Sequence, residues 1–273
     1  MLKSNWHTHT YRCGHARGKD EEYVLEAIKA GVKRLGFSDH CPYPGVVDEG
    51  IRMNYELLED YCSSVKYLKE KYKDQIEIYL GLEVEYDEQF LNTLIEYRKE
   101  FDYLILGQHG LYNALDEKSY FISTGKELDI YCNSIEKACE KGLVDYIAHP
   151  DVCLWSYPRI DEKVIEVANR IADISLKYDV PVEANCGSGV LRGMMSYEDG
   201  LRYAYPTNAF FDIFNKKKCK IIIGLDIHNP ELFKTEEYLN RVKDVLNKSG
   251  CEYDEDYDLI ADAKRRKEKF LYI

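Results

Sequence analysis

The feature that most limits how this chain can fold is an alternation of short β-type runs with helical segments. Seven such runs occur along the chain, and most are separated by segments with apolar residues at three- and four-residue spacing. This alternation builds parallel sheets in which helices connect successive strands. The predicted strands are Ser4–His9, Arg34–Asp39, Glu77–Glu83, Tyr103–Gly107, Asp145–Ala148, Val180–Ala184 and Lys220–Gly224.

Helix start and stop residues support the same division of the chain. Asp161 stands in the capping position before one helical segment, and Gly31 and Gly142 follow the ends of two others. No linker, repeat or low-complexity segment interrupts the pattern, so we expect a single domain over residues 1–273. The predicted helices are Asp20–Ala30, Tyr55–Lys73, Asp87–Lys99, Lys126–Lys141, Glu162–Tyr178, Thr207–Lys217 and Glu236–Lys248.

Seven βα units allow two architectures, a closed or nearly closed barrel and an open doubly wound sheet. A barrel gathers functional residues from the C-terminal ends of all its strands, whereas an open sheet gathers them at one switch point. The periodicity alone does not choose between them. The positions of the polar residues therefore decide.

The charge and the cysteine content limit the compartments in which the protein can work and the partners that it can bind. Acidic residues outnumber basic ones, 49 to 37, which gives a formal net charge of −12 and disfavours binding to long nucleic acids. The nine cysteines are scattered without a Cys-x-x-Cys pair, as in a reduced cytoplasmic protein. No apolar run approaches the ~18 residues of a membrane span, and the first residues lack a signal-peptide pattern. We expect a cytoplasmic protein that binds no membrane.

All seven histidines fall at or just beyond the end of a predicted strand. Two acidic residues share this placement, because Glu83 ends the third strand and Asp226 lies two residues before the last histidine. In a strand, residues i and i+2 point to the same face. His7 with His9, and Asp226 with His228, therefore each present two ligands on one side. The histidines are His7, His9, His15, His40, His109, His149 and His228.

Imidazole and carboxylate together suit zinc, iron or manganese. Each residue alone has an ordinary explanation as a loop, turn or strand-end residue. Nine such groups at strand ends exceed what one ion can use, so the pattern predicts a site with more than one metal ion. Because barrel active sites form at the C-terminal ends of the strands, the same pattern favours the barrel.

This ordered set resembles the polymerase-and-histidinol-phosphatase (PHP) superfamily of metal-dependent phosphoesterases. The resemblance covers nearly the whole chain, and the length is most similar to the stand-alone histidinol-phosphate phosphatase branch. It implies a distorted (β/α)₇ TIM-like barrel of the PHP type with three divalent metal ions. The motifs that carry it are His7-Thr8-His9, His15, Ser38-Asp39-His40, Gly81-Leu82-Glu83, Gly107-Gln108-His109, Ala148-His149-Pro150-Asp151 and Asp226-Ile227-His228.

The resemblance also implies how the ligands divide among the ions. One ion would be bound by His7, His9, Glu83 and Asp226. Glu83 would bridge to a second ion bound by His109 and His149, and His15, His40 and His228 would bind the third. The sequence departs from the usual family wording around Asp226 and after the sixth strand, in residues 185–192, where a substrate pocket is expected.

The activity implied by the resemblance is hydrolysis of a small phosphate monoester, most plausibly L-histidinol phosphate, in histidine biosynthesis. Two ions would turn a shared water into a hydroxide that attacks phosphorus in line. Arg192 is the first candidate to bind the phosphate and Arg159 the second, since guanidinium donates two parallel hydrogen bonds. Candidates to protonate the leaving group are Asp39, His15 and Asp151, and candidates to bind the substrate amine are Glu49, Asp116 and Glu117.

Three other functions remain open. A phosphodiesterase or nuclease could use the same ions on nucleotides or short oligonucleotides. A metal amidohydrolase also begins with His-x-His on a barrel strand, although a carboxylated lysine commonly bridges the metals there, whereas Glu83 would do so here. A non-enzymatic metal-storage protein would close its sites with four protein ligands, whereas nine groups shared among three ions leave open positions.

Overall fold

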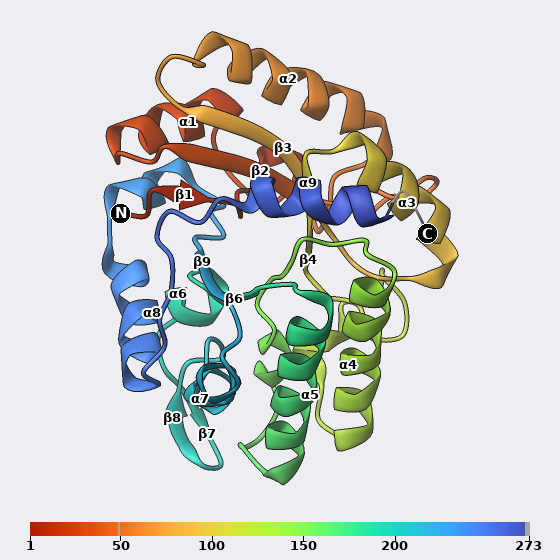
Figure 1. The fold of residues 1–273 in the computed structure, drawn as a ribbon, viewed down its shortest axis with the longest axis vertical. Coiled ribbons are helices and arrows are strands. Elements are labelled where there is room, and N and C mark those ends of the chain that lie inside the picture. The colour runs from red at the N-terminus through yellow and green to blue at the C-terminus, as the bar shows by residue number, and fades with distance from the viewer. Residues whose placement is uncertain (49, 271–273) are drawn as a thin grey trace.

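In the computed structural model, which describes residues 1–48 and 50–270, seven parallel strands form one sheet that curves into a nearly closed barrel (Figure 1). Strands that are neighbours in the barrel follow one another along the chain, as the predicted (β/α)₇ barrel requires. A parallel bridge between Thr8 and Ile227 brings the two outer strands together. In sheet order the strands are β1 (Ser4–Asn5), β2 (Arg34–His40), β3 (Glu77–Val84), β4 (Tyr103–Leu106), β5 (Tyr146–Ile147), β6 (Val182–Asn185) and β9 (Ile221–Gly224).

Helices α4 (Gly125–Glu140) and α5 (Glu162–Tyr178) begin where a side chain accepts from a free backbone N–H group of the first turn. Before α4, the Thr124 hydroxyl accepts from the backbone of Glu127, whose carboxylate accepts from the backbone of Thr124 in return. None of the helices in the described residues has the length and apolar character needed to cross a bilayer. They are α1 (Asp20–Lys29), α2 (Leu58–Lys71), α3 (Leu91–Glu100), α4 (Gly125–Glu140), α5 (Glu162–Tyr178), α6 (Ser188–Leu191), α7 (Asn208–Lys217), α8 (Glu237–Lys248) and α9 (Leu259–Phe270).

The observed elements differ from the predicted ones mainly at the first strand and near the C-terminus. The run Ser4–His9 forms a regular strand only over Ser4–Asn5, but its backbone stays paired beyond that point, since Thr8 bridges to Ile227 and its carbonyl oxygen accepts from the backbone N–H of Ser38. Other elements were not predicted. They include the short helix α6, an antiparallel hairpin of β7 (Met195–Tyr197) and β8 (Gly200–Arg202), and the helix α9.

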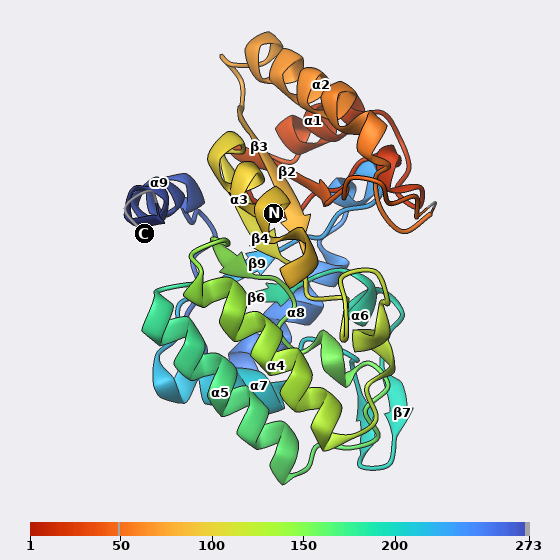
Figure 2. The same ribbon diagram turned by 90° about the vertical axis from the view of Figure 1, so that its right-hand side faces the viewer.

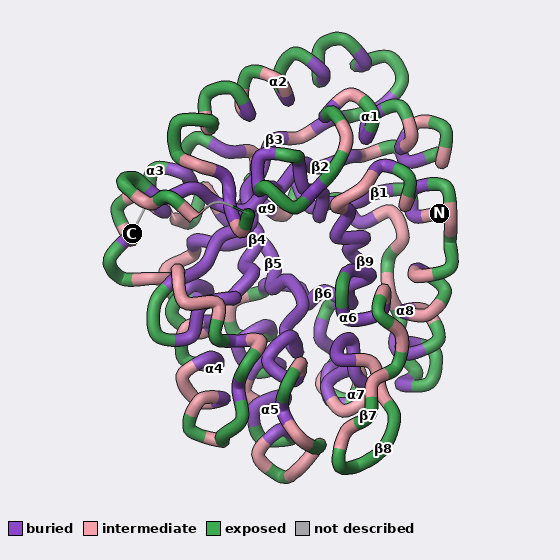
Figure 3. Tube along the Cα trace, turned by 180° about the vertical axis from the view of Figure 1, so that it is seen from behind, coloured by how far each residue is buried: buried purple, intermediate pink, exposed green. Residues whose placement is uncertain are grey.

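Helix α9 covers the end of the barrel at which the strands begin. Leu259, Ile260 and Ala263 of this helix belong to one buried apolar cluster with Trp6, Tyr103 and other residues from inside the barrel. Figure 1 shows α9 lying across the strands, and Figure 2 shows it on the side opposite α6 and β7. Seen from the other end, the strands form a ring of buried chain inside a more exposed layer of helices (Figure 3). The opposite, open end, where the strands finish, is not covered by α9 and is the end at which a functional site is expected.

Candidate metal centre

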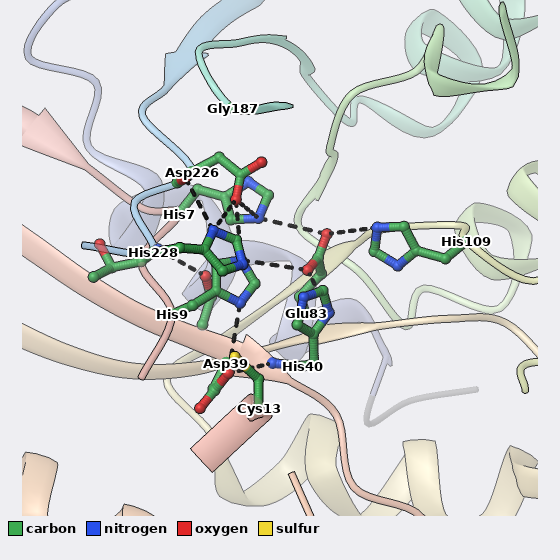
Figure 4. A network of polar contacts seen from close by, with 12 residues as sticks. His7, His9, Cys13, Asp39, His40, Glu83, His109, Gly187, Asp226 and His228 are labelled. Atoms are coloured by element: carbon green, nitrogen blue, oxygen red, sulfur yellow. Dashed lines mark hydrogen bonds and ion pairs between the residues drawn. The ribbon is translucent and has the colours of Figure 1, made fainter. Parts of the chain in front are cut away.

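The seven histidines meet at the C-terminal ends of the strands, around two carboxylates. Figure 4 shows His7, His9, His40, His109 and His228 with Glu83 and Asp226. His9 lies near the middle of this group, with ring centroids 3.9 Å from His228 and 4.3 Å from His40. Asp226 Oδ1 lies 3.2 Å from His9 Nε2 and 3.6 Å from His7 Nε2. The remaining rings complete the group through the pairs His15–His228 at 4.8 Å and His109–His149 at 5.0 Å.

Glu83 is the carboxylate that contacts most of the imidazoles. Its Oε1 lies 2.8 Å from His149 Nε2 and 3.6 Å from His109 Nε2, and its Oε2 lies 3.0 Å from His40 Nδ1. The residue is fully buried at the end of β3. It therefore stands between the side chains that the sequence assigned to different ions, which is the position a bridging ligand needs.

Three glycines leave the space that these carboxylates occupy. A side chain at Gly107 would overlap Glu83, and one at Gly187 would overlap Asp226. A side chain at Gly224 would overlap the carboxylate of Glu183, which lies behind the histidines. These positions accept only hydrogen in place of Cβ, so glycine is required by close approach.

Several atoms in the cluster are buried without any hydrogen-bond partner among the described residues. An unpaired buried polar atom costs about 1–3 kcal/mol, and native proteins contain few of them. Imidazole nitrogens and carboxylate oxygens that face one another without partners are the donor set of a divalent cation. The orphaned atoms are His7 Nε2, His9 Nδ1 and Nε2, Glu83 Oε2, His149 Nδ1, Asp226 Oδ1 and His228 Nε2.

The ligand atoms also fall into sets that one ion could contact. In each of several groups of three residues, the candidate donor atoms lie within 4.8 Å of one another. His7, His9 and Asp226 form one such group, and His15, His40 and His228 form another. A third contains Glu83 and His149 together with His7. His109 stands beside this third group, since its Nε2 is 3.6 Å from Glu83.

The buried acids and imidazoles of the cluster shift one another's pKa values. Burial alone would lower the pKa of His9, but the carboxylates of Asp226 and Asp39, 3.2 Å and 3.5 Å from its ring nitrogens, raise it to about 9. Burial and the nearby His9 lower the pKa of His228 to about 3. Burial would raise the pKa of Glu83, yet the surrounding imidazoles hold it well below its usual value. Protons on some imidazoles balance the acids here, and metal ions that displace them would do the same.

Two ligands have a backbone conformation that non-glycine residues rarely adopt. His149 has φ of 29° and Asp226 has φ of 49°, both in the left-handed region. Such a residue costs about 1–3 kcal/mol and persists where the surrounding structure requires it, most often at functional sites. The strain places both side chains toward the barrel axis, where they contact the other ligands.

Glu183 is a site residue that sequence reasoning missed. It lies on β6, where its Oε1 accepts from His7 Nδ1 at 2.9 Å and its Oε2 accepts from the backbone N–H of His149 at 3.0 Å. A glutamate in the middle of the buried run Val182–Asn185 was the available signal. By accepting a hydrogen bond from Nδ1–H of His7, Glu183 fixes the tautomer in which Nε2 is unprotonated and able to bind a cation.

Asp39 and Asp151 lie behind the histidines and line neither of the cavities at this end. The carboxylate of Asp39 accepts from the Thr10 hydroxyl and from the backbone N–H of His40, and its Oδ1 is 3.5 Å from His9 Nδ1. Asp151 accepts from the backbone and hydroxyl of Thr207. Both acids therefore hold other residues in place.

Two adjoining cavities open over the centre. The inner cavity has a volume of about 260 Å³ and is lined by seven of the nine predicted ligands, including Glu83 and Asp226. The outer cavity, about 470 Å³, is lined by Glu117, Tyr120, Trp155 and Arg192, among others. His15, His40 and His109 line both. A ligand that fills the two would have one end at the predicted metals and the other among aromatic and charged side chains.

The two predicted phosphate-binding arginines lie in different surroundings. The guanidinium of Arg192 lies 4.9 Å from the centre of the Trp155 ring, at the wall of the outer cavity. Arg159 is exposed, and its Nη1 lies 3.6 Å from Glu198, beside the β7–β8 hairpin. Arg159 is absent from the lining of both cavities, so the structure brings only Arg192 to the site.

The three acids predicted as candidates to bind the substrate amine also differ in their surroundings. Glu49 lies outside the described residues. Asp116 accepts from the backbone N–H groups of Leu111 and Tyr112, so its carboxylate shapes its own loop. Glu117 instead lines the outer cavity, with φ of 47°, and burial raises the pKa of its carboxyl group. Of the two acids that the structure describes, Glu117 is the one that lines the cavity.

A comparison with protein families identifies the type of this site. The model described as "PHP domain" matches residues 5–187, which is more than half of the chain. The chain belongs to the PHP domain family. The match ends before β9, but this strand lies in the same sheet and brings Asp226 and His228 to the centre. Family membership and the orphaned ligand atoms together make this a site for divalent metal.

Two relatives of this PHP chain are named as histidinol-phosphatases. A "probable histidinol-phosphatase" of Deinococcus radiodurans is 25% identical over 250 residues, which cover 88% of this chain and 92% of the relative. A "histidinol-phosphatase" of Bacillus subtilis is 32% identical over 156 residues, which cover 52% of this chain and 57% of the relative.

A solved structure confirms the PHP barrel. The histidinol phosphate phosphatase of Lactococcus lactis, complexed with zinc, L-histidinol and phosphate, matches with a TM-score of 0.68 and 17% identity. The match covers 93% of this chain and 95% of that one. At this identity the likeness shows the fold, and it extends over nearly the full length of both chains.

Proposed function

We propose that this protein hydrolyses L-histidinol phosphate to L-histidinol and phosphate, a step of histidine biosynthesis. The observation that carries the proposal is the convergence of seven histidines, Glu83 and Asp226 beneath a cavity lined by Arg192 and Glu117. Relatives named histidinol-phosphatase, one of them matched over 92% of its length, supply the substrate. The product pair seen with the Lactococcus lactis enzyme, L-histidinol and phosphate, agrees with this choice.

Three divalent ions, chosen from zinc, iron and manganese, are the cofactors we propose. His7, His9, Glu83 and Asp226 would hold one ion, and Glu83, His109 and His149 a second. His15, His40 and His228 would hold the third. Bound together, such ions lower the pKa of a water between them and neutralise phosphate oxygens during attack on phosphorus.

The residues of this chain then bind and orient the phosphate. Arg192 follows the short helix α6, and its stacking on Trp155 holds the guanidinium plane at the cavity wall. From there it donates to phosphate oxygens that the ions leave free. Asp39 and Glu183 act through His9 and His7, whose rings they orient.

The other end of the substrate carries an amine and an imidazole, and the outer cavity offers a partner for each. Among the described residues, no side chain donates a hydrogen bond to Glu117, although the residue is only half exposed. A cationic amine would satisfy it and offset the cost of its burial. Tyr120 and Trp155 present aromatic rings for the imidazole, with centroids 5.6 Å apart.

The compartment and partners follow from the same observations. All nine cysteines are free thiols, eight of them buried, which supports the cytoplasm as the location we propose. The partner we propose is the small phosphorylated substrate, since the chain has a net charge of −12 and is poorly suited to long nucleic acids.

Steady-state kinetics on purified protein test the substrate. We expect kcat/KM for L-histidinol phosphate to exceed that for an aryl phosphate without an amine by at least about 100-fold, since charge-assisted hydrogen bonds contribute about 1.5–3 kcal/mol each. In Glu117→Gln, KM for histidinol phosphate should rise about tenfold, while the aryl phosphate is unaffected.

Asp116→Asn is the matched control, because its carboxylate serves the backbone of the same loop. Equal efficiency on both esters would remove the substrate and leave a general phosphatase. Release of mononucleotides from single-stranded DNA at the same rate would favour the diesterase instead.

A further inference from the structure

The guanidinium of Arg52 lies where two loops meet the end of β3. Only 2% of this residue is exposed. Its Nη1 donates to Glu85 Oε2 at 3.1 Å, its Nη2 to the carbonyl oxygen of Ala114 at 3.1 Å, and its Nε to Asp48 at 3.0 Å. One buried cation therefore joins its own loop to β3 and to the loop that follows β4.

Glu85 connects this cation to a predicted metal ligand. Its Oε1 accepts from His109 Nδ1 at 3.1 Å, while its Oε2 accepts from Arg52 and from the Tyr43 hydroxyl, the latter at 3.0 Å. With its proton on Nδ1, His109 turns an unprotonated Nε2 toward Glu83 Oε1, 3.6 Å away. Glu85 thus selects the ring face and the tautomer that a metal ion requires.

Glu183 likewise accepts a hydrogen bond from Nδ1 of His7, but its carboxylate is held by different partners. Its other donors are the backbone N–H of His149, the amide of Asn185 and the hydroxyl of Tyr146, all of them neutral. Glu85 is 1% exposed and has a full counter-charge in Arg52. The charge-assisted hydrogen bond from Arg52 holds the Glu85 carboxylate in place, and with it the oxygen that accepts from His109.

The same guanidinium holds two walls of the outer cavity. Gly50 and Ile51, next to Arg52 in the chain, line this cavity, and the carbonyl oxygen of Gly50 accepts from His15 Nδ1 at 3.1 Å. On the other side, Ala114 belongs to the loop that carries Glu117 into the cavity. A substitution of Arg52 would therefore disturb the predicted ligand His109 and both loops that line the outer cavity.

We propose that the ion pair of Arg52 and Glu85 is a positioning device that orients His109 for its metal ion and fixes the two loops around the outer cavity. Neither residue lines either cavity, so both act through their neighbours. The part that concerns substrate binding rests on the proposed function, whereas the part that concerns metal binding does not.

Zinc binding to the purified full-length protein tests the metal part. After chelation and dialysis, Zn²⁺ is titrated against a competing chromophoric chelator for the wild type, Glu85→Gln, Arg52→Met and the double variant. We expect Glu85→Gln and Arg52→Met to bind one zinc equivalent about 10- to 100-fold more weakly, the usual effect of losing a partner of a ligating histidine. Arg52→Lys, which keeps the charge, should lose less.

The pair of Arg98 and Asp145 is the matched control. It is also fully buried, with Arg98 Nη2 donating to Asp145 Oδ1 at 2.9 Å, but it lies where β5 begins, at the opposite end of the barrel. Asp145→Asn should lower the unfolding temperature without changing zinc affinity. Unchanged zinc affinity in Glu85→Gln and in the double variant, with unfolding temperatures lowered as in Asp145→Asn, would overturn the proposal.

Two further measurements keep the test decisive. If Arg52→Met does not fold, the double variant decides, because it leaves no unpaired charge in the interior. With excess zinc present, Arg52→Met should raise KM for histidinol phosphate about tenfold more than it lowers kcat, because the displaced loops bind substrate. A wild type without turnover of this ester would refute the proposed function, while the zinc titration would still decide the role of the ion pair.

Discussion

The two ends of the barrel are formed by the same strands, yet they hold their buried charges in opposite ways. Where the strands begin, both carboxylate oxygens of Asp145 are satisfied by Arg98, and α9 covers this end with apolar side chains. Where the strands finish, Glu83 and Asp226 each keep a buried oxygen without a partner. At one end the buried carboxylate is therefore neutralised by a cation of the chain itself, whereas at the other end the buried carboxylates keep oxygens free for what the protein binds.

The largest effect is expected at the open end. Glu83→Gln removes the charge that five imidazoles face within 3.6 Å of its oxygens. We expect kcat to fall by more than about 1,000-fold, since a metal pair contributes several kcal/mol to catalysis. Metal analysis should show fewer bound ions per chain.

Glu77→Gln, at the exposed start of the same strand, controls for the substitution and should leave activity unchanged. If Glu83→Gln kept both its metal content and its kcat, the open end would not depend on bound cations, and the contrast between the ends would fail.

At the closed end we expect loss of stability without loss of function. Leu259 of α9 is fully buried, and Leu259→Ala should lower the free energy of unfolding by about 3 kcal/mol. Below the unfolding temperature, kcat/KM should stay within about twofold of the wild type. Chemical denaturation and kinetics measure the two quantities.

Leu176→Ala, which changes a leucine that is 47% exposed on α5, should cost less than about 0.5 kcal/mol. A fall in kcat/KM for Leu259→Ala, measured on folded protein, would show that the closed end also shapes the site.

A smaller effect is expected at the rim of the open end. Arg192→Ala should lower kcat/KM by about 10- to 30-fold, because a charge-assisted hydrogen bond from a partly exposed residue contributes about 1.5–2 kcal/mol. Arg159→Ala, which breaks only an exposed pair with Glu198, should change kcat/KM less than twofold. The opposite ranking would mean that Arg159 leaves Glu198 to bind the phosphate.

Much of the ligand set was readable in the sequence because it depends on local order. A histidine that follows a strand of a parallel barrel must lie at the C-terminal end, whatever the helices do. That rule placed His109 and His149 near Glu83 although the three are far apart in the chain. The same logic placed the first strand over Ser4–His9, whereas the regular strand ends at Asn5 and the backbone beyond it pairs through a bridge at Thr8.

Residues that act through others could not be placed this way. Arg52 lies in a loop whose path has no periodicity, and its partners Glu85 and Ala114 come from two other segments. Glu183 was visible only as an acidic residue in a buried strand, with no sign that it would meet His7 across the barrel. Their roles depend on contacts over 33 to 176 positions, which local patterns do not report.

Residue types at fixed spacing along the chain were enough to predict the alternation of strands and helices and the candidate metal ligands. Which carboxylates remain unpaired and which are held by a cation depends on contacts between distant parts of the chain. The same contacts bring Arg192 and not Arg159 to the cavity and place α9 over the opposite end. Burial and pairing are properties of neighbours in space, and folding chooses those neighbours.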